Sequence, residues 1–487
     1  MPDTIAAIAT GGGKAAIGII RVSGSEAIRI ADEIFHINNG KRLIDAQSGR
    51  MQYGEIYNSR LTDNETSSKT NIEIDVNNYS NIHKRYLIDK CMCAVYHAPN
   101  SYTGEDSVEF FCHGSPIVLS EVLKLLIKHG VRQALPGEFT KRAFLNGKMD
   151  LMQAEAVIDL IDSETPFAAQ NAVGQLQGKI STSLESIYST LVDIMAHFHA
   201  VLDYPDEDID DFKLANYLSA LENAQTKLSR LMASYSRGRI LRGGIKTAII
   251  GQPNTGKSSL LNALLGYDRA IVTGIAGTTR DTIEEKALIG NTLLRLIDTA
   301  GIRKSNDVVE KLGVERSLSA LENADLIFLV IDGSEEMRDC ELDVLNSVPQ
   351  NVPIILIVNK SDLPQKIENL KLRIESKELG VDKFSIQRVS ALTGEGLDNL
   401  EAQIQMWFPE PDSQSIGEII TNARQFDTIS RAKASISEAI TAISESYTPD
   451  IVLVEVEAAL TAIGEVNGKS MREDIISRIF ERFCVGK

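Results

Sequence analysis

The chain has 487 residues, of which 43% are hydrophobic and 24% are charged, and its formal net charge is −17. This length is too great for one hydrophobic core and predicts about three domains. The acidic balance argues against a surface used throughout for nucleic-acid binding, because phosphate contacts need clustered lysine and arginine; a local basic patch or a basic partner stays open. The five cysteines are scattered and form no C-x-x-C pair, which argues against a disulfide framework and against a zinc knuckle.

Hydropathy and the first residues predict a cytoplasmic location. No apolar run approaches the roughly 20 residues that cross a membrane. Residues 1–4 lack the basic start of a secretory peptide, and residues 11–14 lack the arginine-rich composition of an organelle address.

Residues 1–119 are predicted to form an α+β domain. Strand-like runs lie at residues 5–8, 15–22 and 89–96, and an amphipathic helix is expected over residues 25–34 with Ser25 as its cap. Residues 58–84 are rich in Asn, Ser and Thr around one alternating run. We interpret them as an exposed excursion that can include a hairpin.

Residues 120–243 are predicted to be the first half of a helical domain, with helices over residues 151–161 and 184–195. The acidic residues 203–211 interrupt the pattern; a metal site is conceivable there, but a solvated loop at a helix start is favoured. His197 and His199 are two apart on a helix and point to different sides, which favours exposed or packed rings over metal ligands.

Helical patterning returns in residues 410–487, the predicted second half of the helical domain. Its helices are expected over residues 419–445, 451–463 and 471–483. Residues 244–409 are therefore predicted to be a domain inserted into the helical one, entered through a basic, glycine-bearing hinge at residues 237–244 and closed by residues 407–411.

The inserted domain contains the pattern G-x-x-x-x-G-K-S at residues 251–258. A buried strand is predicted before it, at residues 245–250, and a helix after it, at residues 258–265, closed by Gly266. The glycines let successive backbone N–H groups face a β-phosphate, Lys257 supplies a positive charge, and Ser258 can bind magnesium. This pattern predicts a phosphate site.

A second motif, Asp298-Thr-Ala-Gly301, follows a strand predicted over residues 293–297. The Asp298 carboxylate can hold magnesium through water, and the Gly301 N–H can reach a γ-phosphate. Many small GTPases place a glutamine after this motif to orient the attacking water, but the residue here is Ile302, which forms no hydrogen bond through its side chain. Another residue of the following segment must position water.

Two more motifs predict that the base is guanine. Residues 353–358 read as a buried strand that delivers Asn359-Lys-Ser-Asp362, and residues 389–392 fit a loop that braces the base. The Asp362 carboxylate can accept two hydrogen bonds from guanine, a pair that adenine does not offer. Each motif alone could be a helix cap or a surface turn, but four motifs in order at strand ends favour a ligand site.

The predicted fold is thus multidomain: an α+β N-terminal domain, a helical bundle and an inserted α/β P-loop GTPase domain of Ras-like type.

With these motifs in place, the chain resembles the tRNA-modification GTPases called MnmE or TrmE over almost its full length. The resemblance rests on runs at both ends and in the middle of the sequence, namely residues 3–10, 18–24, 102–106, 113–114, 136–146, 251–254, 271–281 and the terminal Cys484-Val-Gly-Lys487. The excursion at residues 58–84 is longer than we expect for the family.

The resemblance implies a homodimer, joined by the N-terminal domains, that hydrolyses GTP when two GTPase domains meet around potassium. With an FAD-dependent partner, MnmG, such proteins add an aminomethyl or carboxymethylaminomethyl group to C5 of the wobble uridine of certain tRNAs. A 5-formyl- or methylene-tetrahydrofolate supplies the one-carbon unit.

By residue match, the resemblance implies further roles for single positions. Asn254, Thr273, Ile275 and Thr278 match the potassium site, and Ser258 and Thr279 match the magnesium ligands. Lys257 and Glu310 match catalytic residues, with Glu310 positioning water. Arg21, Glu109, Lys148 and Lys487 match the folate site. The full set expected at GTP is Asn254, Thr255, Gly256, Lys257, Ser258, Ser259, Thr273, Gly274, Ile275, Ala276, Gly277, Thr278, Thr279, Asp298, Thr299, Ala300, Gly301, Asn359, Lys360, Asp362, Ser390, Ala391 and Leu392.

Part of this agrees with physical chemistry. Potassium at the phosphates can neutralise developing charge, and Asn254 offers it a neutral oxygen. Arginine and lysine suit the glutamate tail of a folate, and a carboxylate suits the pterin amines. Cys484 follows a helix expected to dock, so its thiol either assists methylene transfer as a nucleophile or is a small buried apolar group.

Two other classes of function stay open from the sequence. An RNA-binding assembly GTPase of the Era type would carry a KH-like Gly-x-x-Gly module and a basic C-terminal face, whereas the C-terminal region here is helical and acidic. A regulatory GTPase switch would need neither the folate site nor Cys484. Folate binding by the isolated chain separates the main interpretation from both.

Overall fold

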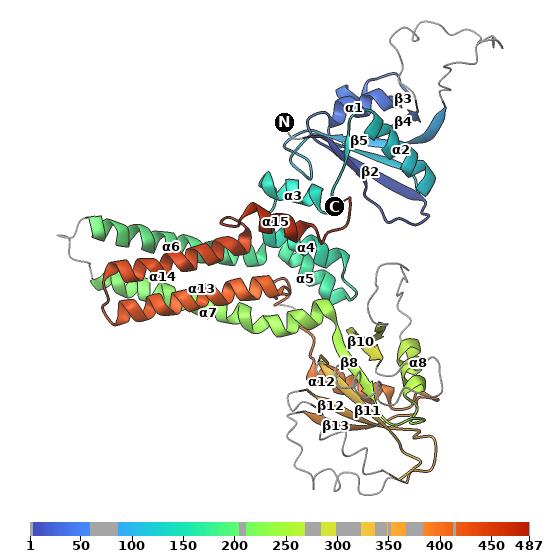
Figure 1. Cartoon of the computed structure of the whole chain (residues 1–487), viewed down its shortest axis with the longest axis vertical. Coiled ribbons are helices and arrows are strands. Elements are labelled where there is room, and N and C mark those ends of the chain that lie inside the picture. The colour runs from blue at the N-terminus through green and yellow to red at the C-terminus, as the bar shows by residue number, and fades with distance from the viewer. Residues whose placement is uncertain are drawn as a thin grey trace. The chain divides into compact units, whose positions relative to one another are not determined.

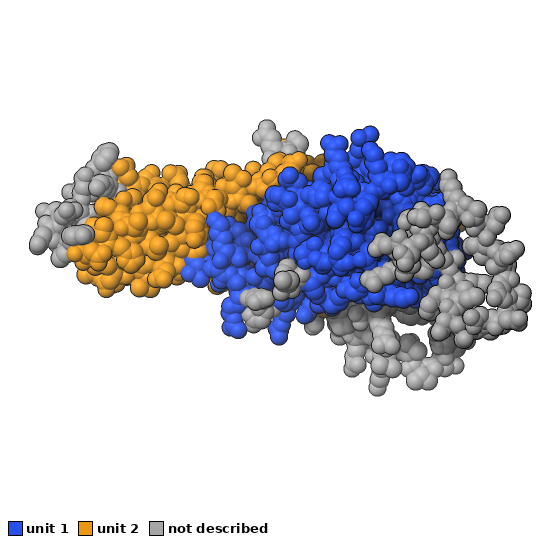
Figure 2. Space-filling view, turned by 90° about the horizontal axis from the view of Figure 1, so that it is seen from above, with its two compact units in different colours: residues 1–158, 461–487 blue, residues 159–460 orange. Residues whose placement is uncertain are grey.

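The computed structural model consists of two compact units, each with more contacts inside it than to the other; Figure 2 colours them separately. The first unit contains residues 1–158 and 461–487, and the second contains residues 159–460. The structure describes residues 3–58, 86–203, 211–267, 284–298, 323–336, 348, 352–366, 383–412 and 415–486. The domain boundaries expected near residues 119, 243 and 409 stay predictions. The excursion expected at residues 58–84 lies outside the described residues except for its first residue.

The first unit is built on a seven-stranded sheet with the order β3-β4-β5-β6-β2-β1-β7. Its strands are β1 (Ile5–Ile8), β2 (Ile17–Ser23), β3 (Phe35–Ile37), β4 (Gln52–Tyr57), β5 (Leu87–Tyr96), β6 (Ser107–His113) and β7 (Arg132–Gln133). All neighbours pair antiparallel except β1 and β7. Strand β1 has the bounds predicted from the sequence.

Apolar side chains on both faces of this sheet pack against helices. Helices α1 (Ala27–Ile34) and α2 (Pro116–Lys128) contribute to one apolar core with alternate strand residues such as Ile20, Val22 and Phe110. On the other face, Phe139 of α3 (Glu138–Leu145) packs with Ile5 and Ala7. Because successive strand residues point to opposite faces, Arg21 and Glu109 lie on the α3 face.

The first unit also contains α4 (Leu151–Ile161), which extends three residues into the second unit, and α15 (Glu473–Phe480). Leu151 and Ala154 form a core with Ile476, Phe480 and Phe483, so residues more than 300 positions apart in sequence pack together. The expectation that the last helix reaches Phe483 was wrong, because the helix ends at Phe480.

In the second unit, long helices form a bundle (Figure 1). They are α5 (Pro166–Leu176), α6 (Lys179–Asp203), α7 (Asp211–Gly243), α13 (Ala423–Ser444) and α14 (Pro449–Asn467). Helix α14 continues into the first unit from Thr461 on. Tyr235 of α7 stacks on Phe426 of α13 with ring centroids 4.6 Å apart. The helices on the two sides of the inserted sequence therefore pack together. None of the described helices is long and apolar enough to span a bilayer.

The second sheet has six strands in the order β13-β12-β11-β8-β10-β9, and only β9 runs antiparallel to its neighbour. Its strands are β8 (Ile245–Ile250), β9 (Glu284–Ile289), β10 (Thr292–Asp298), β11 (Leu326–Asp332), β12 (Ile354–Asn359) and β13 (Phe384–Arg388). Helices α8 (Lys257–Tyr267) and α12 (Leu397–Trp407) belong to the same region. The predicted fold class, including the α/β P-loop domain, is confirmed.

Three local expectations need correction. Helix α1 begins after Glu26 without a side-chain cap, and the Thr4 hydroxyl accepts a bond from the Glu26 N–H instead of Ser25 capping the helix. Gly266 lies inside α8 rather than closing it. The basic hinge expected at residues 237–244 is helical up to Gly243, because these residues continue α7, and only Gly244, with φ +71°, departs from the helix.

Candidate functional site

The predicted phosphate loop lies between β8 and α8. Its backbone has positive φ at Gly251, Asn254 and Gly256, a region that glycine adopts at no steric cost and asparagine at little. A Cβ at Gly251 would lie 2.2 Å from a carbonyl oxygen of β11, and one at Gly256 would lie 2.1 Å from Asn359 Nδ2. Only glycine fits at these two positions, so the loop folds as its sequence pattern predicts.

Lys257 points back into this loop. Its Nζ donates to the carbonyl oxygens of Gly251, at 2.9 Å, and Gln252, at 2.6 Å. The buried Thr255 donates its hydroxyl to Gln252 O at 3.0 Å. The loop thus curves around an ammonium group next to the N-terminus of α8, an arrangement that attracts an anion. Ser258 and Ser259 are exposed in the first turn of that helix.

Asn359, at the end of β12, joins the phosphate loop to the loop after β13. It is 2% exposed. Its Nδ2 donates to Thr255 O at 2.8 Å, and its Oδ1 accepts from the Ala391 N–H at 3.0 Å. A single buried amide therefore fixes the spacing between two loops that the sequence places far apart.

Asp362 lies beside the same loop. Its Oδ1 accepts from the Ser390 hydroxyl at 2.5 Å, and Ser390 is fully buried. Lys360, with φ +63°, turns the chain between Asn359 and Asp362. The structure thus brings Asn359, Asp362, Ser390 and Ala391 together, while the Leu392 side chain is 84% exposed.

Asp332, which the sequence reasoning did not single out, belongs to this group. It ends β11 and forms an ion pair with Lys360 Nζ, and it accepts from the Ser334 N–H at 2.9 Å and hydroxyl at 2.7 Å. Burial acts to raise the pKa of Asp332, but the bonds from Lys360 and Ser334 outweigh it and lower that pKa. An aspartate at the end of a buried strand was the available signal, since strand ends in such sheets bind ligands.

Other predicted nucleotide residues can be placed only in part. Asp298 ends β10, and its Cα pairs with that of Ile249 in the strand that leads to the phosphate loop. Thr273 to Thr279, Thr299, Ala300, Gly301, Ile302 and Glu310 lie outside the described residues.

A second group of predicted site residues lies on the α3 face of the first sheet. Arg21 in β2 is directly opposite Glu109 in β6, and its Nε donates to Glu109 Oε1 at 2.8 Å. The guanidinium lies 5.0 Å from the Tyr102 ring centroid and 5.7 Å from that of Phe139. An ion pair whose cation lies against two aromatic rings can hold a flat, polar ligand.

Arg142 of α3 fixes the loop that carries Tyr102. Its guanidinium is bonded to Glu105 at 3.1 Å, Asp3 at 2.8 Å and Glu138 at 3.1 Å. Burial acts to lower the pKa of Arg142, but the carboxylates of Glu105 and Glu138 raise it overall. Lys148, another predicted site residue, donates from Nζ to the Pro99 carbonyl at 3.0 Å, so it lies beside the same loop region.

The chain's C-terminal residues return to this unit. Gly137 N–H donates to the Cys484 carbonyl at 3.3 Å, and Val485 forms a bridge with Pro136. A Cβ at Gly486 would lie 2.4 Å from the Ile8 carbonyl, so the tail lies against the end of β1. Cys484 is exposed, which contradicts the alternative of a buried apolar group. Lys487 lies outside the described residues.

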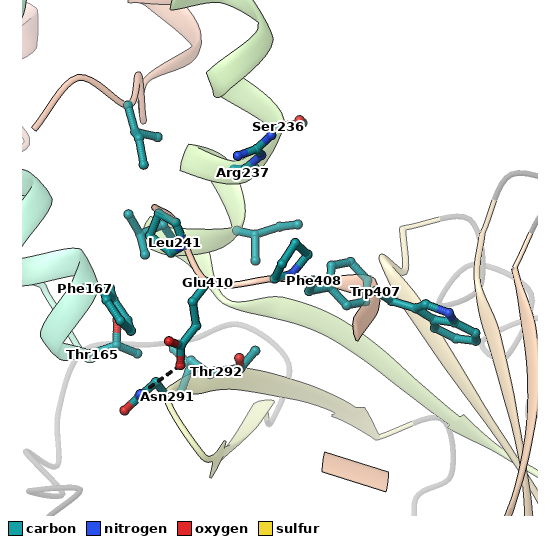
Figure 3. Close-up of a pocket in the computed structure, with 15 residues that line it drawn as sticks. Thr165, Phe167, Ser236, Arg237, Leu241, Asn291, Thr292, Trp407, Phe408 and Glu410 are labelled. Carbon is teal, nitrogen blue, oxygen red and sulfur yellow. Dashed lines mark hydrogen bonds between the residues drawn. The ribbon is translucent and has the colours of Figure 1, made fainter. Parts of the chain in front are cut away.

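A cavity of about 290 Å³ lies elsewhere in the second unit (Figure 3). Its lining is mostly apolar and includes Phe167, Leu241, Trp407 and Phe408. Glu410 lies at the cavity and accepts from Asn291 Nδ2 at 2.9 Å. Sequence reasoning did not foresee this cavity, which is formed where the chain enters and leaves the sheet.

Comparison with known proteins covers the whole chain. A family model described as MnmE helical domain matches residues 151–484, and one described as GTP-binding protein TrmE N-terminus matches residues 4–148. The tRNA modification GTPase MnmE of Clostridioides difficile is 39% identical over 486 residues, covering 100% of this chain and 99% of that protein. Its counterpart in a Thermoanaerobacter species is 40% identical with the same coverage.

Among solved structures, Era of Aquifex aeolicus is 31% identical over 39% of this chain and 66% of its own, with a TM-score of 0.26. The curated relatives, by contrast, match from end to end. The chain therefore belongs to the MnmE family of tRNA modification GTPases.

Proposed function

We propose that this chain is a potassium-dependent GTPase that acts on tRNA as a homodimer together with an FAD-dependent partner, MnmG. The proposed product carries an aminomethyl or carboxymethylaminomethyl group on C5 of the wobble uridine of certain tRNAs. A tetrahydrofolate derivative supplies the one-carbon unit. The shared name of the full-length relatives supports the tRNA part of this proposal.

The GTP part rests on one observation above all, the buried Asn359 amide that ties Thr255 to Ala391. It sets the phosphate loop and the base loop at a fixed separation, as a nucleotide spanning both requires. The Asp362 carboxylate, held by Ser390, is then the acceptor for the guanine N1–H and amine. Lys257 exchanges its loop carbonyls for phosphate oxygens.

The residues of the loop also fit two cations. Ser258 presents an exposed hydroxyl in the first turn of α8, which suits magnesium, with Thr279 as the second proposed ligand. Asn254 is exposed at the turn of the loop and offers a neutral oxygen to potassium, with Thr273, Ile275 and Thr278 completing that proposed site. Bound potassium would supply positive charge at the phosphates. Glu310 is proposed to position the attacking water, since Ile302 cannot.

The folate part is supported by the α3 face of the first sheet. Arg21 and Glu109 offer a cation and an anion side by side, and the Arg21 guanidinium lies over the Tyr102 ring; such a set fits the amines and the flat ring of a pterin. Lys148 and Lys487 are proposed to hold the acidic tail of the folate. Cys484, exposed on the tail that lies against β1, is proposed to assist one-carbon transfer.

Coupling between the two activities is proposed to pass through the segments that enter and leave the inserted sheet. Gly243, the last residue of α7, and Pro409, at the cavity, lie on these two segments. A GTP-dependent rearrangement there would have to favour one of two states at both sites, because coupling needs differential affinity.

Analysis of wobble uridine by mass spectrometry tests the tRNA function. Deletion of the gene should abolish the C5 substituent, and the intact gene should restore it. A Cys484→Ser gene should restore GTP hydrolysis but not the substituent. Unchanged wobble uridine in the deletion strain would rule out the proposed reaction. Binding of 5-formyltetrahydrofolate to the purified chain separates it from an Era-type GTPase or a regulatory switch.

A further inference from the structure

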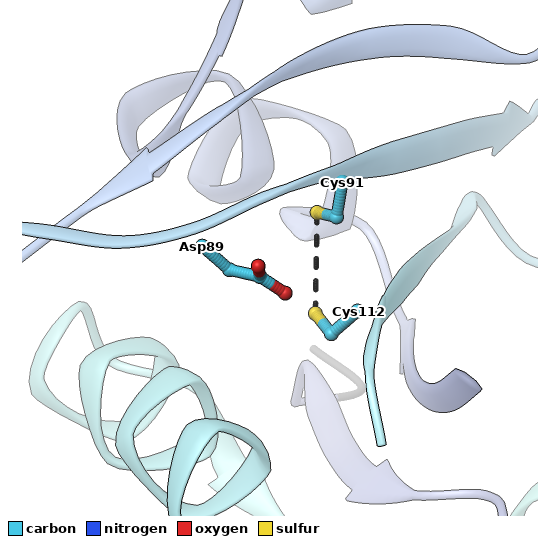
Figure 4. Close-up of side chains that lie close together, drawn as sticks. All are labelled: Asp89, Cys91 and Cys112. Atoms are coloured by element: carbon cyan, nitrogen blue, oxygen red, sulfur yellow. Dashed lines mark hydrogen bonds between the residues drawn. The ribbon is translucent and has the colours of Figure 1, made fainter. Parts of the chain in front are cut away.

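Three side chains that play no part in the proposed function meet inside the first unit. Asp89 and Cys91 lie on β5 and Cys112 lies on β6 (Figure 4). One ligand atom from each lies within 4.8 Å of the other two, and all three residues are buried. The Cys91 and Cys112 sulfurs are 4.0 Å apart.

The strand pairing explains why they meet. Strands β5 and β6 pair antiparallel with Met92 opposite Phe111, so Cys91 and Cys112 are the next two residues facing each other. Asp89 lies two residues before Cys91 and therefore points to the same face of the sheet. The sequence spacing argued against a zinc knuckle, but two cysteines that are 21 positions apart become neighbours through the sheet.

We propose that Asp89, Cys91 and Cys112 form a binding site for a divalent metal ion of the zinc class. Thiolate and carboxylate are ligands that zinc accepts, whereas magnesium and calcium prefer oxygen alone. Zinc–sulfur bonds of about 2.3 Å in a tetrahedron place two sulfurs about 3.8 Å apart, close to the separation found here. Three protein ligands leave a fourth position for water.

Outer groups support the carboxylate of this site. His113 Nδ1 lies 2.7 Å from Asp89 Oδ1, and the His113 N–H donates to Asp89 Oδ2 at 2.8 Å. Such hydrogen bonds to a ligating carboxylate are usual around bound metals, because they orient it.

A disulfide is the competing fate of a cysteine pair. Forming one would remove two thiol hydrogens and two electrons, and would need a peroxide or a small disulfide as oxidant. Disulfide formation therefore depends on such an oxidant reaching two sulfurs that are buried in the core of the first unit. A metal ion, in contrast, displaces the thiol protons directly as it binds.

The test uses the full-length protein purified under reducing conditions and dialysed against zinc. After gel filtration, elemental analysis should find about one zinc ion per unmodified chain. Cobalt in place of zinc should give sulfur-to-cobalt charge-transfer absorption in the near ultraviolet. Cys91→Ser and Cys112→Ser should each lower zinc retention at least about tenfold.

Cys93→Ser is the matched control, because Cys93 is a buried cysteine on the same strand and the same face but outside the cluster. It should retain zinc like the unmodified chain, and zinc should raise the melting temperature of both. The cobalt spectrum of the unmodified chain does not depend on whether a variant folds. Absence of that spectrum, equal zinc retention in all variants, or a Cys91–Cys112 disulfide in the purified protein would each overturn the proposal.

Discussion

The two candidate sites of this protein are built in opposite ways. In the second unit, Lys257, Asp332 and Asn359 follow or end neighbouring parallel strands, and the loops at those strand ends form the site. In the first unit, Arg21 and Glu109 lie in the middle of antiparallel strands and meet only because β2 and β6 are in one particular register.

This difference explains which site can be read from short stretches of sequence. A site at strand ends uses backbone N–H groups and adjacent side chains, so each part is a contiguous motif. A site on a sheet face collects one residue from each of several segments, so each residue taken alone resembles an ordinary surface charge. Four predictions, ordered by expected effect, test the two sites and whether each works without the other.

Lys257→Ala should have the largest effect. Removing the ammonium group from the phosphate loop should lower GTP turnover by about 10²–10³-fold, while folate binding by the first unit should stay unchanged. Lys246→Ala is the matched control, because Lys246 is an exposed lysine on the adjoining strand β8. Phosphate release assays and folate titration measure both quantities. A parallel loss of folate binding would show that the sites are not independent.

Asp362→Asn should change base preference rather than abolish binding. The amide reverses one of the two hydrogen-bond partners offered to the base, which should cost about 3 kcal/mol of GTP binding and favour XTP. Competition binding with GTP, XTP and ATP measures this, and the gain of XTP binding is its own control for folding. Equal affinity of the unmodified chain for ATP and GTP would contradict the assignment of Asp362.

Arg21→Gln should weaken folate binding and leave GTP turnover unchanged, the reverse of what is expected for Lys257→Ala. Loss of the cation beside Glu109 should weaken 5-formyltetrahydrofolate about 10- to 100-fold, since a hydrogen bond to a charged group contributes about 1.5–3 kcal/mol. GTP turnover should be unaffected. Arg29→Gln serves as control, because Arg29 is an exposed arginine in α1 of the same unit. Normal folate affinity in the Arg21 variant would place the ligand elsewhere.

Asp332→Asn should have the smallest effect, about 1 kcal/mol of stability from the lost pair with Lys360. The folded pKa of Asp332 is lowered from its ordinary 3.8, so the pair's contribution is complete above that value and is lost as pH falls through the lowered pKa. Melting curves of the variant and the unmodified chain should therefore differ by a constant amount near neutral pH and converge in acid. A constant difference down to the lowest pH would assign the effect to something other than this carboxylate.

The sequence by itself determined the elements whose cause is local. The bounds of β1, α4 and β8 agree with hydrophobic period alone, because each is buried in the way its pattern requires. Gly251 and Gly256 mark the phosphate loop because no other residue fits the backbone there. The sequence predicted where a helix lies better than where it ends. Helix α7 continues through the glycines at 238 and 243, where a hinge was predicted.

Only the tertiary structure decided which distant residues meet. The Asn359 bridge between two loops, the Asp332–Lys360 pair, the Arg142 network and the Asp89, Cys91 and Cys112 cluster all join separate segments. Local periodicity determines which face of an element is apolar, but strand order and register determine which side chains become neighbours. These depend on the packing of the whole unit, so a short stretch of sequence carries no signal for them.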